Sequence, residues 1–321
     1  MHKKIWTSNV IAEKLEGKRV ILVVNGEAVL LTSDGETTKT EEIPSLSSSH
    51  DKTDRHVVQY VTYGEDNGYD SITVRTPDSD LFFTLLYYAG TWKKLKELIY
   101  DMGTGLNRRR TDILKIARKL GQKMCTALLG IYVFTGEDCN SAFKGKGKVK
   151  ALKILDKNTE YLDTFSEIGE QWEVSTEVSQ SLQKFTCALY GLPRYEQVNK
   201  ARLYKLKTMC GNKEEISPKT KINFYNLVPC LNSLNPHIKR VNYQTRRIKL
   251  SHVMFPDIPA PSKVHGWVLL NAVLEPLWTD GAVIPDKLVD LLPETYDAHT
   301  DTESGDESGA DSDWSDSLSL Y

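Results

Sequence analysis

Two aspartates separated by one residue, Asp78 and Asp80, follow directly after a β-rich segment, residues 69–75. Ligands of open α/β sheets bind outside the carboxyl ends of the strands, where both carboxylates would lie. Carboxylates at this spacing on a turn can converge on a hard cation such as Mg²⁺. In the alternative, Asp78 or Ser79 caps the following helix by accepting its first amide hydrogens. Taken alone, the pair favours the cap.

A second acidic site begins a segment that is rich in glycine and lysine. The segment reads GEDCNSAFKGKGKVKA from Gly136 and carries Asp138 near its start. Successive glycines let backbone amides point at a phosphate, and the N-terminus of the next helix favours an anion. The predicted phosphate contacts are Gly145, Lys146, Gly147, Lys148 and Lys150. A flexible turn followed by a solvated lysine face is the alternative.

The segment from Gly136 resembles the signature of flap-endonuclease-like nucleases of the XPG and PIN type. That signature is an aspartate, a Gly-x-Gly hairpin, a basic residue and an alanine-bearing helix. Residues 48–192 look like a group of uncharacterised metazoan proteins with this domain, and residues 266–290 look like their C-terminal region. The resemblance covers most of the chain outside the acidic C-terminus.

The resemblance implies divalent-metal-dependent hydrolysis of phosphodiester bonds in nucleic acid, DNA in preference to RNA. Two ions, Mg²⁺ or Mn²⁺, would activate water and stabilise the leaving group. The matched metal ligands are Asp54, Asp78, Asp80 and Asp138, of which the last three are also the expected catalytic residues. Gly145 and Gly147 match the hairpin glycines that hold backbone phosphate.

Departures from the family pattern define a second functional hypothesis. Lys52 stands where an acid is expected, and Glu137 stands where these proteins usually have cysteine. The early strand, residues 20–24, runs into Asn25-Gly26 without the family's first aspartate. The alternative is a catalytically inactive module that binds nucleic acid or protein on a PIN-like scaffold. A small-molecule α/β enzyme fits less well, because no dinucleotide-binding turn or nucleophile elbow follows a strand.

The elements that would position these residues predict an α/β fold. Apolar runs on both sides of Asn25-Gly26 predict a β-hairpin, and the polar stretch 33–51 predicts a mobile loop. Strand 69–75, helix 81–90 and strand 95–100 follow in α/β order. Further helices are expected over 54–63, 113–120, 125–134, 148–158 and 176–192. The fold that the resemblance implies is a three-layer PIN-like domain with a central, mostly parallel sheet.

The predicted organisation has five parts. They are an N-terminal hairpin and mobile loop (1–50), a nuclease-like core (51–195), a basic helical extension (196–255), a hydrophobic C-terminal piece (256–295) and a disordered acidic tail (296–321). Ten acids and no lysine or arginine follow Lys287, so residues 1–287 hold 41 basic against 33 acidic residues, a net charge of about +8. A basic body suits a polyanion such as nucleic acid, and the tail would screen that surface or bind a protein partner. Both features could instead serve solubility.

Other features exclude several classes of protein. No apolar run reaches the length of a membrane span, and the start of the chain lacks a secretion signal, so a nuclear or cytoplasmic protein is expected. The five cysteines have no zinc-ligand spacing and are expected to be reduced. The basic clusters 107–110 and 246–249 are candidates for phosphate contacts or for a solvated helix face.

Overall fold

The computed structural model of the protein describes residues 9–211 and 223–281. Contacts divide them into two compact units, here called unit 1 (9–114 and 247–259) and unit 2 (115–211, 223–246 and 260–281). The described residues confirm the mixed α/β class. The predicted acidic tail and the end of the predicted C-terminal piece lie outside them, and the five-part organisation stays a prediction.

Unit 1 begins with a small antiparallel sheet. Strands β1 (Arg19–Val24) and β2 (Glu27–Ser33) form the predicted hairpin, with Val24 paired to Glu27. Both turn residues have positive φ, 54° at Asn25 and 80° at Gly26, as a tight hairpin turn with the right twist requires. The expected mobile loop instead contains β3 (Thr38–Glu42), which pairs with β2. The loop prediction was wrong there because this edge strand is polar throughout and shows no apolar alternation.

Strand β2 is apolar on both faces because each face is covered. Helix α2 (Asn9–Leu15) packs on one side, where Leu15 joins Val29 and Leu31. The 3₁₀ helix η1 (Pro44–Leu46) closes the other side over Ala28 and Leu30. A strand buried on both faces reads as a continuous hydrophobic run, which explains the pattern from residue 28 to 31.

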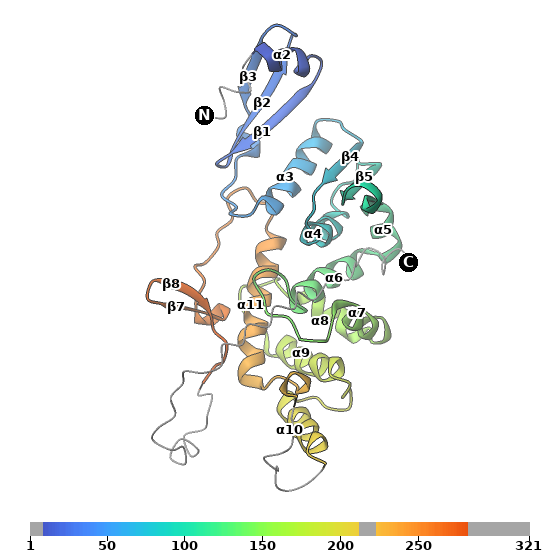
Figure 1. The fold of residues 1–321 in the computed structure, drawn as a ribbon, viewed down its shortest axis with the longest axis vertical. Helices are drawn as coiled ribbons and strands as arrows, with labels where there is room; N and C mark the ends of the chain where they lie inside the picture. Colours follow the sequence, from blue (N-terminus) through green and yellow to red (C-terminus); the bar gives the residue numbers. More distant parts are fainter. Residues whose placement is uncertain (1–8, 212–222, 282–321) are drawn as a thin grey trace. The chain divides into compact units, whose positions relative to one another are not determined.

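A second sheet in unit 1 carries the first candidate site. Strands β4 (Ser71–Arg75) and β5 (Glu97–Met102) are parallel and are joined through helix α4 (Asp80–Tyr88), while β6 (Arg109–Asp112) pairs antiparallel with β5. Helix α3 (Thr53–Asp66) contacts α4, and both lie beside β4 in Figure 1. The expected central sheet is thus a three-stranded mixed sheet with one parallel pair in the described residues, and not a mostly parallel one.

The segment 247–259 belongs to unit 1, and its backbone carbonyls contact Tyr88 of α4 and His50, which precedes α3. The Tyr88 hydroxyl donates to the carbonyl of Lys249 at 2.7 Å. The Nε2 atom of His50 lies 2.8 Å from the carbonyl of Val253. Buried polar side chains of unit 1 therefore find their partners in residues that are about 160 to 200 positions away in sequence.

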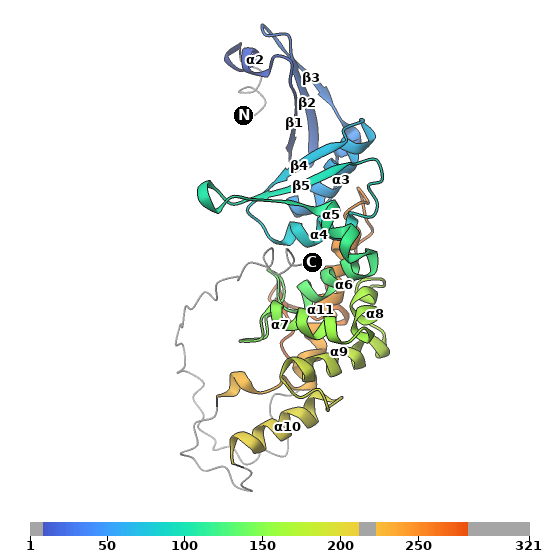
Figure 2. The same cartoon turned by 90° about the vertical axis from the view of Figure 1, so that its right-hand side faces the viewer.

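Unit 2 is helical. Its elements are α6 (Gln122–Phe134), α7 (Lys148–Lys157), α8 (Glu160–Glu167), α9 (Thr176–Leu189), α10 (Val198–Met209) and most of α11 (Leu231–Lys249), and α5 (Ile113–Leu120) leads into it. Helix α8 contacts both α6 and α9, and Figure 2 shows the three side by side. Nearly every residue of α6 from position 127 onward is buried, as its apolar sequence predicts.

The last described elements form a hairpin, β7 (Trp267–Leu270) and β8 (Val273–Pro276), which is preceded by the 3₁₀ helix η4 (Lys263–His265). Another 3₁₀ helix, η3 (Phe224–Asn226), lies before α11. In the described ranges, every helix is too short or too polar to cross a bilayer.

Candidate nucleic-acid interface

The Asp78 carboxylate accepts a hydrogen bond from the neighbouring backbone. Its Oδ1 atom accepts the amide hydrogen of Asp80 at 2.8 Å, and the Asp78 amide donates to the Thr76 hydroxyl at 3.1 Å. The Tyr100 hydroxyl donates to the Asp78 carbonyl at 2.5 Å. Asp78 therefore stabilises the turn into α4, as the capping interpretation predicts, and both aspartates are half-buried at the carboxyl end of β4.

A third carboxylate at this sheet edge, Asp101, was missed from the sequence. It lies in β5 directly opposite Arg75 of β4 and is 2% exposed. Arg108 binds it through two nitrogens, Nε at 2.9 Å and Nη2 at 2.5 Å, and Arg75 lies 3.6 Å away. The hydrogen bonds from Arg108 lower the pKa of Asp101 despite its burial. The strand-end rule that selected Asp78 would also have selected Asp101, because β5 is the parallel neighbour of β4.

The start of α3 holds the predicted acid Asp54 in its first turn and Lys52 at the N-cap position. The neighbouring carboxylate, Asp51, is bound by two arginines: Arg55 at 2.6 Å and Arg247 at 2.7 Å. Burial opposes ionisation of Asp51, but the hydrogen bond from Arg247 and the charge of Arg55 outweigh it and lower the pKa. Asp51 is thus an internal ion-pair partner that joins α3 to the segment 247–259.

The four predicted metal ligands divide between the two units. Asp54, Asp78 and Asp80 belong to unit 1, and Asp138, which is exposed after the end of α6, belongs to unit 2. Carboxylates are the donors that Mg²⁺ and Mn²⁺ prefer. Within residues 9–211 and 223–281, however, no three Asp, Glu, His or Cys side chains gather into a group that could hold a metal ion. Binding of Mg²⁺ or Mn²⁺ by the four aspartates therefore stays a prediction.

The glycine-lysine segment of unit 2 starts from a fixed point at the end of α6. Gly136 has φ of +116°, and a Cβ there would lie 2.7 Å from the Cβ of Ala142, so the chain folds back on itself at this residue. The Phe143 ring packs on Phe134 at 5.1 Å between centroids and on His237 at 5.1 Å. These contacts hold the beginning of the segment against the helical core.

The predicted phosphate contacts lie where this segment enters α7. Gly147 is the N-cap of the helix, and its carbonyl accepts the amide hydrogen of Lys150 at 3.0 Å. Gly145 has φ of +69°, which a side chain would disfavour. The first amides of α7 and the positive end of its dipole therefore point toward the lysine-rich turn.

Three alternate lysines of the segment each contact an aromatic ring. The distances from Nζ to the ring centroid are 4.0 Å for Lys144 over Tyr225, 5.0 Å for Lys146 over Tyr190 and 4.9 Å for Lys148 over Tyr132. Burial lowers the pKa of Lys146, and the positive charges of Lys150 and Lys205 lower it further. Like charges thus gather around Lys146, on a surface that also offers aromatic rings.

The other two basic clusters take part in internal contacts. Arg108 binds Asp101, and Arg247 binds Asp51. Arg246 donates to the carbonyl of Gly169 at 3.4 Å. These arginines have partners within the fold, and Arg246 also lies over the Trp172 ring, at 5.8 Å from its centroid.

Comparisons of the chain with protein-family models, with curated protein sequences and with solved structures found no match. Function is therefore inferred from the residues and contacts described above.

Proposed function

We propose that the protein binds nucleic acid through the lysine segment of unit 2, residues 144–150. The observation that carries this proposal is the alternation of lysines over aromatic rings at the N-terminus of α7. Proteins that bind single strands combine a basic surface, which follows the phosphates, with aromatic side chains, on which bases stack. The predicted phosphate contacts at Gly145, Lys146, Gly147, Lys148 and Lys150 belong to this surface.

The electrostatics of the segment support an anionic partner. Burial is the largest cause of the lowered pKa of Lys146, and repulsion by neighbouring cations, which a bound phosphate would relieve, adds to it. Each phosphate that is neutralised also releases condensed counterions, which makes affinity depend on salt. The net charge of about +8 over residues 1–287 adds a long-range attraction of the same sign.

The test is fluorescence anisotropy of the full chain with labelled single-stranded DNA, duplex DNA and single-stranded RNA. We expect the double variant Lys146→Ala, Lys150→Ala to bind roughly ten- to a hundredfold more weakly, because each lysine is assigned one phosphate contact. Lys184→Ala is the matched control, since Lys184 is paired with Glu196 at 3.1 Å. Equal affinities for the wild type and the double variant would reject the proposal.

A second candidate is the metal-dependent cleavage that the family resemblance implies, on a PIN-like scaffold. The observation that favours it is the position of Asp78 and Asp80 at the carboxyl end of β4, beside the parallel strand β5. Flap, single-stranded and duplex substrates would be incubated with Mg²⁺ or Mn²⁺. Cleavage that Asp80→Asn and Asp138→Asn both abolish would support this candidate. Cleavage that survives both substitutions, or its absence from the wild type, would reject the assignment.

A further inference from the structure

A cavity of about 460 Å³ lies beside the lysine segment, entirely within unit 2. Volumes of this size are typical of sites for small molecules. Its walls come from five parts of the chain: the segment before α7, the end of α9, helix α10, the turn η3 with the start of α11, and the residues after β8. Its lining residues include pairs that are nearly 140 positions apart in sequence, such as Ser141 and Trp278.

The charge of this cavity is positive. Among its described lining residues, Lys144, Arg202 and Arg240 are basic and none is acidic. Arg240 is only 2% exposed, and its Nη1 atom donates to the carbonyls of Gly266 at 3.1 Å and Leu277 at 2.6 Å. In the described part of the chain no carboxylate is paired with Arg240. A buried cation whose hydrogen bonds go to neutral carbonyls is costly, and an anion in the cavity would offset that cost.

Histidine at the base of the cavity does not add to this charge. Burial lowers the pKa of His237 to about 4, so the ring is neutral near pH 7. Its Nε2 atom lies 2.9 Å from the carbonyl of Phe134 and must therefore carry the hydrogen. Nδ1 then accepts from the Ser141 hydroxyl at 3.1 Å. The neutral ring holds Ser141, three residues before the lysine segment, at the wall of the cavity.

Aromatic side chains form the rest of the wall. The rings of Phe224, Tyr225 and Trp278 are each more than 60% exposed. Rings that belonged to the hydrophobic core would be buried, and exposed apolar groups that lie together mark binding sites. Lys144 lies over Tyr225, and the Arg240 guanidinium lies 5.5 Å from the centre of the Trp278 ring. Exposed rings beside cations match a ligand that has both an aromatic part and a negative charge.

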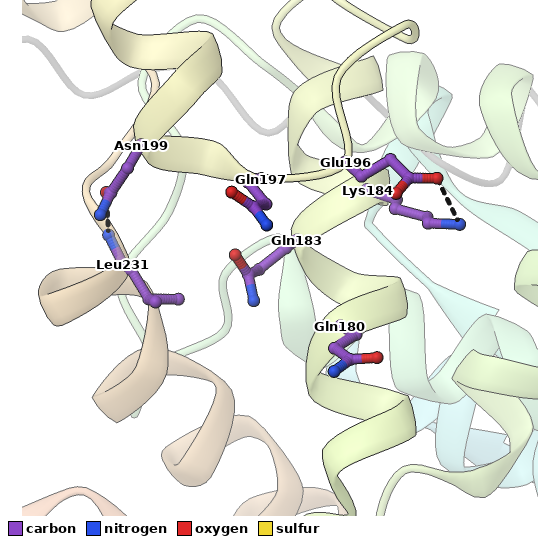
Figure 3. Close-up of a pocket in the computed structure, with 7 residues that line it drawn as sticks. All are labelled: Gln180, Gln183, Lys184, Glu196, Gln197, Asn199 and Leu231. Carbon is purple, nitrogen blue, oxygen red and sulfur yellow. Dashed lines mark hydrogen bonds and ion pairs between the residues drawn. The ribbon is translucent and has the colours of Figure 1, made fainter.

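A second cavity in unit 2 shows how specific this combination is. It measures about 480 Å³ and is lined by amides, among them Gln180, Gln183 and Gln197 (Figure 3). Of the described residues that line it, Lys184 is the basic one and is paired with Glu196, and none is aromatic. The two cavities are similar in size, but of the two it is the first whose described lining residues combine cations with exposed rings, as binding of an aromatic anion requires.

We propose that the cavity lined by Lys144, Arg202, Arg240 and the exposed rings binds one nucleotide of a single-stranded nucleic acid. Its base stacks against Tyr225 and Trp278, and its phosphate binds the cations. The neighbouring nucleotides continue along the lysine segment. This inference rests on the proposed function and adds that the preferred substrate is single-stranded, because a base inside a duplex cannot enter a cavity without leaving the stack.

The test uses the full chain and an oligonucleotide that carries one 2-aminopurine, whose fluorescence falls when the base stacks. The variant is Tyr225→Ala, Trp278→Ala, which removes exposed rings and so should leave folding intact. We expect quenching with the wild type, and affinity about five- to 150-fold weaker in the variant. A strand with one abasic position should lose affinity for the wild type and little for the variant. Lys184→Ala serves as the control from the second cavity.

Three other results would overturn the inference. Unchanged affinity in the ring variant, with weaker binding by Lys146→Ala, Lys150→Ala, would reject the cavity and keep the proposed function. Equal affinity for duplex and single strands would reject the preference for an unpaired base. Binding of adenosine monophosphate with no binding of any strand would assign the cavity to free nucleotides and reject the proposed function as well.

Discussion

The two units differ in the partners of their charged side chains near the predicted site residues. At the carboxyl edge of the mixed sheet in unit 1, the buried Asp101 is bound by Arg108, and Asp51 is bound by two arginines. In unit 2, the cations Lys144 and Lys146 contact rings, and Arg240 contacts carbonyls. Charges that are paired within the protein stabilise the fold, whereas cations that have no acidic partner among the described residues point to an external anion.

The largest effect is expected at His237 of unit 2, whose buried ring should make stability depend on pH. Its pKa of about 4 lies below the ordinary value of about 6.5, so the unfolded chain takes up a proton at higher pH than the folded chain does. Stability that is fully present above pH 6.5 is therefore lost as the pH falls toward 4, by about 3 kcal/mol. We expect His237→Gln to flatten this dependence in urea unfolding, since its amide can still donate to the Phe134 carbonyl.

The control for that measurement is Gln180→Ala in unit 2, which replaces an exposed side chain that does not titrate. It should leave the loss of stability between pH 6.5 and 4 as large as in the wild type. If His237→Gln also left it unchanged, the pKa of His237 would not be lowered in the fold, and the neutral ring that accepts a hydrogen bond from Ser141 would lose its support.

A matched pair of glycines compares the rigidity of the two units. A Cβ at Gly130 of α6 would lie 2.4 Å from the carbonyl oxygen of Phe165, whereas one at Gly64 of α3 would meet only the flexible end of Ile72 at 2.8 Å. We expect Gly130→Ala to destabilise the protein by about 1–3 kcal/mol through overpacking. Gly64→Ala should stay within about 1 kcal/mol of the wild type, because a rotamer change and better helix propensity compensate. Similar losses in thermal unfolding would show that α6 can move away from α8.

The ion pair between Asp101 and Arg108 should stabilise unit 1. Arg108→Ala should lower the melting temperature by several degrees near pH 7, because Asp101 stays buried with its charge less compensated. The pKa of Asp101 is lowered in the fold, so this stabilisation is present above about pH 4 and is lost as the pH falls through the folded value. The difference between wild type and variant should therefore shrink in acid. Lys96→Ala, which removes an exposed pair with Asp70, should change the melting temperature far less.

The smallest effect is expected at Asp78. Asp78→Ala should cost about 1 kcal/mol, the typical value of a lost cap, because the Asp80 amide loses its acceptor. Asp78→Asn retains an acceptor oxygen and should be close to the wild type in chemical denaturation. A large loss in Asp78→Asn would mean that the negative charge itself matters here, which would favour the metal-binding interpretation over the cap.

Local signals in the sequence predicted much of the fold. Asn25-Gly26 predicted the first hairpin because few residues other than these accept positive φ in a tight turn, and the apolar sequence of α6 predicted its burial. Strand β3 escaped prediction because its residues are polar, and β6 because Arg109 and Arg110 read as a basic cluster. Edge strands owe their structure to pairing with a neighbour, which a local pattern does not contain.

The candidate sites divide in the same way. The glycine-lysine turn could be proposed as a phosphate site from the sequence because Gly145 and Gly147 lie two positions apart among lysines, and phosphate binding there stays a prediction. Asp101 was overlooked because its importance depends on β5 pairing in parallel with β4. The aromatic cavity was beyond prediction, since Phe143, Tyr190 and Trp278 become neighbours only when α9, α11 and the C-terminal hairpin have packed together.

The central claim is that the lysine segment of unit 2 binds the phosphates of nucleic acid. Its most direct test is the salt dependence of single-strand binding by the wild type and by Lys146→Ala, Lys150→Ala. We predict that the logarithm of the binding constant falls linearly with the logarithm of salt concentration, and that the slope of the variant is smaller by about 2. Identical slopes for the two proteins, or binding that does not respond to salt, would contradict the claim.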